Sequence, residues 1–191
     1  QAVNWDFMRN KIKNSGRNIK VLNLFAYTGG ATVACLSAGA SVTHVDSSKG
    51  MVEWCKENVI DSGYKEANIR YLVDDCIKFV KREIRRGNHY DGIIMDPPSF
   101  GRGTNGEVWQ FEKDTFEFIK LCSELLSDKP LFFLVSSYSA GVSGEVVANM
   151  LKISLNNRFD GKISCSEIGI PIKNTQLCLP CGNYTRWEAN D

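Results

Sequence analysis

Short apolar runs alternate with helical patterns along most of the chain, and this alternation constrains the fold more than any other feature. Each run is bounded by turn residues, as buried strands are. The five strands predicted in this way cover residues 19–25, 41–46, 69–75, 90–98 and 130–139. Helices are predicted over about 30–37, 48–62, 76–86, 111–126 and 143–155. Such alternation is typical of an α/β fold, with a doubly wound parallel sheet between two layers of helices.

The end of the chain follows a different pattern. The segments "KISCSEIGIP" and "LCLPCGNYTRWE" predict two strands joined by a polar turn, which would form an antiparallel hairpin at one edge of the sheet. The 191 residues suit a single domain, with residues 1–18 as a lead-in segment. Because the sequence opens on Gln1 rather than methionine, we expect a piece of a longer chain that lacks an N-terminal part.

Composition restricts the environment more than the partner. The net charge of +1 neither favours nor excludes a polyanionic partner. No apolar run approaches the roughly twenty residues of a membrane span, so no membrane association is expected. The seven cysteines are an odd number and mostly fall inside apolar patterns, where a free thiol behaves as a small hydrophobe. We therefore expect a reducing compartment, the cytoplasm.

Glycines and acidic residues follow the ends of the first four predicted strands. Tyr27 to Gly30 follow the first strand, and Asp46, Asp75 and Asp96 stand at the ends of the next three. Open parallel sheets bind ligands beyond the carboxyl ends of their strands, near the point where the strand order reverses. The sequence therefore predicts that these residues share one site.

The first turn favours a nucleoside without a pyrophosphate group. Asp46 lies seventeen positions after Gly29, close to where a carboxylate that binds a ribose diol is found in dinucleotide folds. The turn itself is neither G-x-G-x-x-G nor the phosphate loop G-x-x-x-x-G-K-[ST]. A ligand made of adenosine and a sulfonium amino acid fits both observations.

The stretch "NLFAYTGGATVACLSAGASVTHVDSS" resembles the class I S-adenosylmethionine-dependent methyltransferases. Together with "VDDC", "DPPSF" and "LPCGNYTRW", it is similar to the subfamily that modifies large-subunit ribosomal RNA, the cytosine-C5 and guanine-N7 methyltransferases. The resemblance implies a Rossmann-like seven-stranded sheet, S-adenosyl-L-methionine as cofactor with S-adenosyl-L-homocysteine as product, and methylation of an RNA base in rRNA processing.

The resemblance also implies roles for individual residues. The backbone of Phe25, Ala26, Tyr27, Thr28 and Gly29 would line the methionine part of the cofactor. Asp46 would accept hydrogen bonds from both ribose hydroxyls, with Ser47 beside it, and Met51 would cover one face of the adenine. Asp75 would accept from the adenine amine, and the Cys76 amide would donate to the ring.

The motif "DPPSF" is the predicted reaction centre. Pro97 and Pro98 stiffen the loop and lack an amide hydrogen, so the loop presents Asp96 and backbone carbonyls to an acceptor. Phe100 is expected to stack on an extruded base. In the glycine-rich stretch 99–109, Arg102 and Trp109 are expected to contact phosphate and base.

The acceptor atom is inferred from a missing thiol. The cytosine-C5 branch carries a cysteine in the loop after the fifth strand, where this chain reads Ser136-Ser137-Tyr138-Ser139. Methylation of a carbon needs a covalent adduct, whereas a nitrogen has its own lone pair. The sequence therefore favours a nitrogen acceptor. A methyltransferase acting on protein or a small molecule, and a non-catalytic nucleoside- or RNA-binding module, stay open as alternatives.

Two other features are interpreted as structural. Cys178 and Cys181 form a single C-x-x-C without a second pair or a histidine partner, so no metal site is expected. One predicted helix carries a basic face that could bind RNA phosphates but is more typical of a solvated surface. Its residues are Lys78, Lys81, Arg82, Arg85 and Arg86. The oligomeric state is not predicted.

Overall fold

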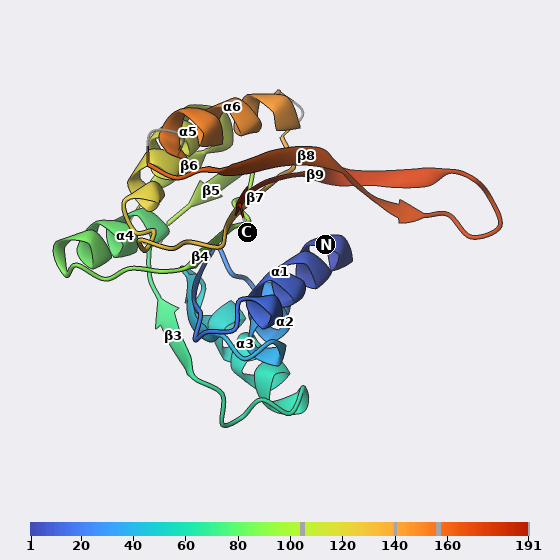
Figure 1. Cartoon of the computed structure of the whole chain (residues 1–191). Helices are drawn as coiled ribbons and strands as arrows, with labels where there is room; N and C mark the ends of the chain where they lie inside the picture. Colours follow the sequence, from blue (N-terminus) through green and yellow to red (C-terminus); the bar gives the residue numbers. More distant parts are fainter. Residues whose placement is uncertain (104–105, 140, 156–157, 191) are drawn as a thin grey trace.

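Figure 1 shows the computed structural model of the chain, which describes residues 1–103, 106–139, 141–155 and 158–190. Seven strands of these ranges form one sheet in the order β3-β2-β1-β4-β7-β9-β8. Their bounds are β1 Lys20–Leu24, β2 Ser41–Asp46, β3 Ile69–Val73, β4 Gly92–Met95, β7 Phe132–Ser137, β8 Gly161–Pro171 and β9 Cys178–Ala189. The first five strands of that order run parallel, and β9 and β8 run antiparallel to their neighbours. The predicted fold class is confirmed.

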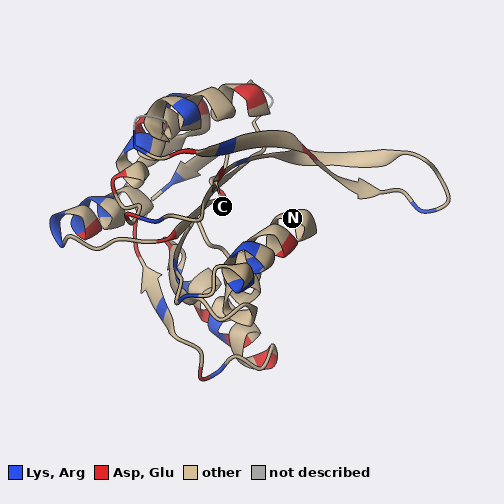
Figure 2. Ribbon diagram, in the orientation of Figure 1, with Lys and Arg blue, Asp and Glu red and all other residues tan. Residues whose placement is uncertain are grey.

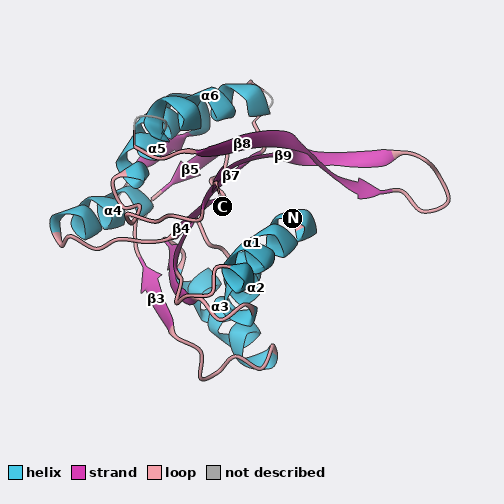
Figure 3. Ribbon diagram, in the orientation of Figure 1, coloured by secondary structure: helices cyan, strands magenta, loops and turns pink. Residues whose placement is uncertain are grey.

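Helices cover both faces of the sheet (Figures 1 and 3). Their bounds are α1 Ala2–Asn14, α2 Gly30–Ser37, α3 Lys49–Asp61, α4 Cys76–Arg85, α5 Phe111–Ser123 and α6 Gly144–Leu155. The first three helices contribute to one buried apolar cluster, with Met8, Cys35 and Val59 among its members. The last three contribute to a second cluster on the other face, with Phe79 and Phe118 among its members. Because both faces are covered, β4 is apolar and buried throughout, and β1 is buried at every position after Lys20.

The strand order fixes where a ligand can bind. The chain moves outward from β1 to β2 and β3, and then returns to place β4 on the opposite side of β1. The order therefore reverses between β1 and β4, and their carboxyl ends leave a crevice at the edge of the sheet. This position agrees with the site predicted from the strand ends.

Two segments differ from the expectations. Residues 1–18 were expected to be a lead-in, but α1 occupies most of this segment and buries Met8 and Ile12, which lie four residues apart on one helical face. The glycine-rich stretch 99–109 contains a short antiparallel hairpin of β5 (Phe100–Arg102) and β6 (Val108–Gln110). Thr104 and Asn105 of that stretch lie outside the described residues.

The C-terminal hairpin extends well beyond the body of the sheet (Figure 1). Ile170, Leu177 and Leu179 near its far end are exposed. A search of the described helices found no segment with the length and apolar character that a membrane crossing needs.

Candidate active site

Two neighbouring cavities lie at the carboxyl ends of the parallel strands. The first, called the Asp96 cavity, has a volume of about 240 Å³. It is lined by Gln1, Asn4, Trp5, Met8, Asn23, the stretch Phe25–Ala31, Ile94, Asp96, Leu134 and Ser136. The second, called the Asp75 cavity, has a volume of about 90 Å³. Its lining comprises Phe25, Ser47, Asp75, Cys76, Ile77, Pro98, Gly101, Arg102, Gly103, Glu107, Val108 and Trp109. Phe25 borders both cavities. Of the residues predicted from the strand ends, Tyr27–Gly30 and Asp96 line the first cavity and Asp75 lines the second, whereas Asp46 lines neither.

The turn after β1 holds a strained backbone. Phe25, Tyr27 and Gly29 have φ angles of 54°, 50° and 86°, in the left-handed region that residues other than glycine rarely adopt. A Cβ atom at Gly29 would lie 2.3 Å from the Cys55 Sγ atom of α3. Such strain is characteristic of ligand sites, where the surrounding structure holds a shape that the free chain would avoid.

Asp46 ties the end of β2 to this turn. Its Oδ2 atom accepts a hydrogen bond from the Tyr27 amide at 2.9 Å, and its Oδ1 atom accepts one from the Ser48 amide at 2.9 Å. Because each carboxylate oxygen has two lone pairs, both atoms keep the capacity to accept a second hydrogen bond. Tyr27 lines the Asp96 cavity and Ser47 lines the Asp75 cavity, so Asp46 stands between the two.

Asp75 and Cys76 begin α4 at the wall of the second cavity. The Asp75 side chain caps the helix, with Oδ1 accepting from the Lys78 amide at 2.8 Å. Cys76 is the first residue of the helix, so its amide has no partner within the helix and is available to a ligand. The Cys76 Sγ atom accepts a hydrogen bond from the Phe25 amide at 3.3 Å, and burial raises the pKa of this thiol well above its usual range. The thiol is therefore a structural group.

Asp96 is the acid at the reversal point of the sheet. Burial raises the pKa of its carboxyl group, while hydrogen bonding from Tyr138 and Ser136 opposes that shift. Its Oδ1 atom is buried without a hydrogen-bond partner among the described residues. Burial and the neighbouring Asp96 charge raise the pKa of Tyr138 to about 12, so the phenol stays protonated at neutral pH and can donate. A buried carboxylate with an unpaired oxygen can accept a proton or a hydrogen bond from a ligand.

The structure corrects the role expected for Trp109. Its side chain is only 7% exposed, and its ring packs 5.1 Å from the Phe25 ring, measured between centroids. The indole Nε1 atom donates a hydrogen bond to the Pro98 carbonyl at 2.8 Å. Trp109 therefore anchors the "DPPSF" loop from a buried position in the wall of the Asp75 cavity, which favours a structural role over stacking on an incoming base.

Phe100 and Arg102 lie at the surface of the same loop region. The Phe100 side chain is 54% exposed, and the Arg102 guanidinium lies 6.0 Å from the centre of its ring. Both positions are compatible with substrate contact. Met51, by contrast, is half-buried in the first turn of α3 and lines neither cavity.

The basic face of α4 is largely engaged in ion pairs. Lys78 pairs with Glu107, and Arg82 pairs with Asp74. Figure 2 shows Lys and Arg interspersed with Asp and Glu over the helices. Cys178 and Cys181 are free thiols on β9, and no group of three metal-ligating side chains occurs in the part of the chain that the structure describes.

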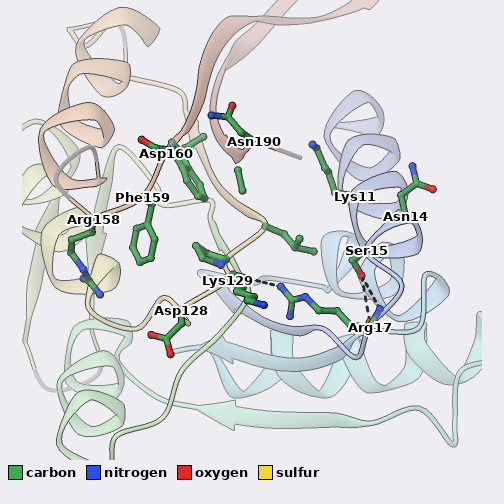
Figure 4. Close-up of a pocket in the computed structure, with 14 residues that line it drawn as sticks. Lys11, Asn14, Ser15, Arg17, Asp128, Lys129, Arg158, Phe159, Asp160 and Asn190 are labelled. Carbon is green, nitrogen blue, oxygen red and sulfur yellow. Dashed lines mark hydrogen bonds between the residues drawn. The ribbon is translucent and has the colours of Figure 1, made fainter.

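A larger hollow of about 580 Å³ lies at the opposite edge of the sheet, where β1 and β7 begin (Figure 4). Two of its basic side chains are already paired with carboxylates. Lys11 pairs with Glu188 at 2.8 Å, and Arg17 pairs with Asp91 at 2.9 Å. None of the strand-end acids lines this hollow.

Comparison with known proteins agrees with the geometry at the carboxyl edge. The model of the S-adenosylmethionine-dependent methyltransferase family matches residues 3–131. The chain belongs to this family. Most lining residues of both cavities fall inside the matched segment.

Relatives within the family include ribosomal RNA large subunit methyltransferases K/L. The protein of Shewanella frigidimarina is 32% identical over 174 residues, which are 88% of this chain and 21% of that protein. The protein of Desulfotalea psychrophila is 30% identical over 148 residues, 76% of this chain and 20% of that protein. The chain thus spans about a fifth of the length of these curated relatives.

Solved structures of methyltransferases match the whole fold. A SAM-dependent methyltransferase from Agrobacterium tumefaciens is 39% identical, with a TM-score of 0.93 over 98% of this chain and 61% of that chain. The methyltransferase SMU.776, crystallised with S-adenosylhomocysteine, is 26% identical, with a TM-score of 0.69 over 95% of this chain and 48% of that one.

The cavities fit the cofactor of this family. Among the described lining residues of the two cavities, Arg102 is the only arginine or lysine, so little positive charge is present to hold a pyrophosphate. Asp75 and the Cys76 amide offer an acceptor and a donor suited to an adenine edge, and Asp46 has spare acceptor capacity for ribose hydroxyls. S-adenosyl-L-methionine is therefore the cofactor that this donor and acceptor set suits.

Proposed function

We propose that this chain transfers a methyl group from S-adenosyl-L-methionine to a nitrogen atom of a base in ribosomal RNA. The observation that carries the proposal is the buried Asp96 carboxylate at the carboxyl end of β4, next to the turn of positive φ angles. The names of the ribosomal RNA relatives support the substrate class. An RNA substrate of this kind would place the protein in the cytoplasm.

The nature of the nearby thiols supports a nitrogen acceptor. A carbon acceptor in cytosine needs an attacking thiolate, but the described lining of the Asp96 cavity contains no cysteine. Cys76 lines the neighbouring cavity, yet its buried thiol has a raised pKa and is engaged with the Phe25 amide. Ser136 and Tyr138 occupy the end of β7 and the loop after it, where a nucleophilic cysteine would be needed.

The proposed chemistry assigns a task to each group at the site. The bound cofactor supplies an electrophilic methyl group on a sulfonium. Asp96 would accept a hydrogen bond from the base and so direct the lone pair of the acceptor nitrogen towards the methyl group. The N–CH3 bond would form as the S–CH3 bond breaks and S-adenosyl-L-homocysteine leaves, and Asp96 would take the proton where the acceptor nitrogen carries one. Phe100 would stack on the base, and Arg102 would contact a phosphate. Trp109 would keep the "DPPSF" loop in place through the Pro98 carbonyl.

Methyl transfer to fractionated cell material tests the proposal. The protein is incubated with tritiated S-adenosyl-L-methionine and with RNA, protein or small-molecule fractions, and labelled nucleosides are identified by mass analysis. We expect label in an N-methylated nucleoside of ribosomal RNA. Asp96→Asn should lower the turnover about 100-fold, while S-adenosylhomocysteine still binds. Label confined to protein or small molecules would refute the RNA substrate, and a C5-methylated pyrimidine would refute the nitrogen acceptor.

A further inference from the structure

Helix α1 forms a wall of the Asp96 cavity. Gln1, Asn4, Trp5 and Met8 all line this cavity, and their spacing places them on one face of the helix. A Cβ atom at Gly30 would lie 2.8 Å from the Trp5 ring, so the turn after β1 and the helix are in close contact. The segment before β1 therefore contributes directly to the site.

A hydrogen-bond chain connects Asp96 to this helix. The Gln1 Nε2 atom donates to the Tyr138 hydroxyl at 2.6 Å and to the Ser136 Oγ atom at 3.2 Å. Both hydroxyls also interact with the Asp96 carboxylate. Because an ionised carboxylate can only accept, the hydroxyls donate to Asp96 and must accept from Gln1. The charge of Asp96 thus fixes which end of the Gln1 amide faces the hydroxyls.

The same chain fixes the orientation of Asn4. With its Nε2 atom used, Gln1 presents Oε1 to Asn4, and the Asn4 Nδ2 atom donates to it at 3.0 Å. Asn4 is 0% exposed, and its Oδ1 atom has no hydrogen-bond partner among the described residues. A buried acceptor without a donor is destabilising, so its presence in a cavity wall indicates a donor on a ligand.

We propose that the Asn4 Oδ1 atom accepts a hydrogen bond from the α-ammonium group of the cofactor, an inference that rests on the proposed function. The cofactor offers few donors. Its adenine amine suits Asp75 and its ribose hydroxyls suit Asp46, while its carboxylate donates nothing. The α-ammonium group is the remaining donor, and the methionine part is expected along Phe25–Gly29, which lines the same cavity as Asn4.

Calorimetry with matched ligands tests this assignment. S-adenosylhomocysteine, its desamino analogue and methylthioadenosine are titrated into the wild type, Asn4→Ala and Asn4→Leu. Removal of the amine should weaken binding to the wild type about tenfold to hundredfold, the usual effect of a hydrogen bond to a charged group. Both Asn4 variants should lose this difference, whereas methylthioadenosine should bind all three proteins equally. Asn10→Ala, an exposed change on the same helix, should behave as wild type.

Other calorimetric results would contradict either the role of Asn4 or the proposed function. Undiminished discrimination between S-adenosylhomocysteine and the desamino analogue in both Asn4 variants would overturn the inference. Loss of discrimination in Asp96→Asn, with Asn4→Ala unaffected, would assign the ammonium group to Asp96. Weaker binding of methylthioadenosine by both Asn4 variants would reduce Asn4 to a structural role. If the wild type bound none of the three nucleosides, the proposed function itself would fail.

Discussion

The two edges of the parallel sheet carry hollows of opposite character. At the amino edge, the hollow of about 580 Å³ is the more spacious, but Lys11 and Arg17 in its wall are already paired with carboxylates. At the carboxyl edge, the Asp96 cavity measures only about 240 Å³, yet buried oxygen atoms of Asn4 and Asp96 in its wall have no hydrogen-bond partner within the described part of the chain. Among the described residues that line the amino-edge hollow, the buried Trp187 indole N–H is the comparable group.

This difference shows that the volume of a cavity indicates a ligand site less well than buried polar atoms without hydrogen-bond partners. A protein interior normally pairs its polar groups and avoids left-handed backbone at residues other than glycine. The wall of the Asp96 cavity breaks both rules. Phe25 and Tyr27 have left-handed backbone, and the Asp96 Oδ1 atom has no hydrogen-bond partner among the described residues. Unpaired buried polar atoms also occur elsewhere, as at Thr115, but in the wall of the Asp96 cavity they coincide with left-handed backbone. This coincidence indicates that a ligand completes the structure there.

Gly29→Ala is expected to break the carboxyl edge most severely. The new methyl group would force alanine into a left-handed conformation and would meet the Cys55 Sγ atom at 2.3 Å. Strain and overpacking together should lower the free energy of unfolding by about 2–5 kcal/mol, measured by urea denaturation. Gly39→Ala is the matched control, since Gly39 has a φ of 89° but no atom within 4 Å of the new methyl. It should lose only about 1–2 kcal/mol, and equal losses would show that the contact with α3 is unimportant.

A buried polar chain beneath the same turn should make stability depend on pH. Asn23 donates to Thr32, whose hydroxyl lies 3.0 Å from the His44 Nδ1 atom, and His44 also contacts Cys55. Burial lowers the pKa of His44 to about 4, although Asp46 and the Tyr27 backbone oppose the shift. Below pH 6.5 the unfolded chain therefore binds a proton that the folded protein excludes.

The resulting loss of stability should develop between pH 6.5 and about 4 and reach about 3 kcal/mol. Urea denaturation across this range measures it, with His44→Gln as the comparison because glutamine does not titrate. The wild type should lose more stability than the variant as the pH falls, since other groups titrate equally in both. Parallel pH profiles for the two proteins would contradict a neutral buried His44.

The sequence predicted the carboxyl edge well because its determinants are local. A parallel strand followed by a turn and a helix imposes its own pattern, and Asp46 and Asp75 can be located by counting from that pattern. Apart from β5 and β6, which were not predicted, the helix and strand assignments between β1 and α6 agree with the structure to within a few residues. The roles of the strand-end acids in binding stay predictions.

The contributions of α1 and Trp109 could not be predicted in the same way. Asn4 reaches the cavity only because α1 packs against α2, and the residues around Asn4 form no motif that specifies this contact. The spacing of Asn4, Met8 and Ile12 was the available signal, since it indicates one buried helical face. Trp109 sits in a glycine-rich stretch that resembles a loop. Its burial depends on Phe25, which is distant in sequence, and on Phe118 of the following helix.

Asp46→Ala tests whether the carboxyl edge binds the cofactor. Loss of the carboxylate removes the expected ribose acceptor and also frees the Tyr27 and Ser48 amides. The dissociation constant for S-adenosylhomocysteine should rise about tenfold to hundredfold, as measured by calorimetry. Asp74→Ala is the control, because Asp74 is a neighbouring acid whose carboxylate pairs with Arg82 and not with the turn after β1. A similar loss in both variants would point to net charge rather than to a ribose contact.

Changes at the amino edge should have the smallest effects. Lys129 is exposed beside the hollow of Figure 4, and Arg17 is partly exposed in its pair with Asp91. Lys129→Ala should leave stability unchanged, and Arg17→Ala should lower it by at most about 1 kcal/mol, as is usual for a partly solvated ion pair. Neither variant should change the dissociation constant for S-adenosylhomocysteine beyond about twofold. Weaker cofactor binding by about tenfold in either one would mean that the spacious hollow, and not the strained carboxyl edge, controls the site.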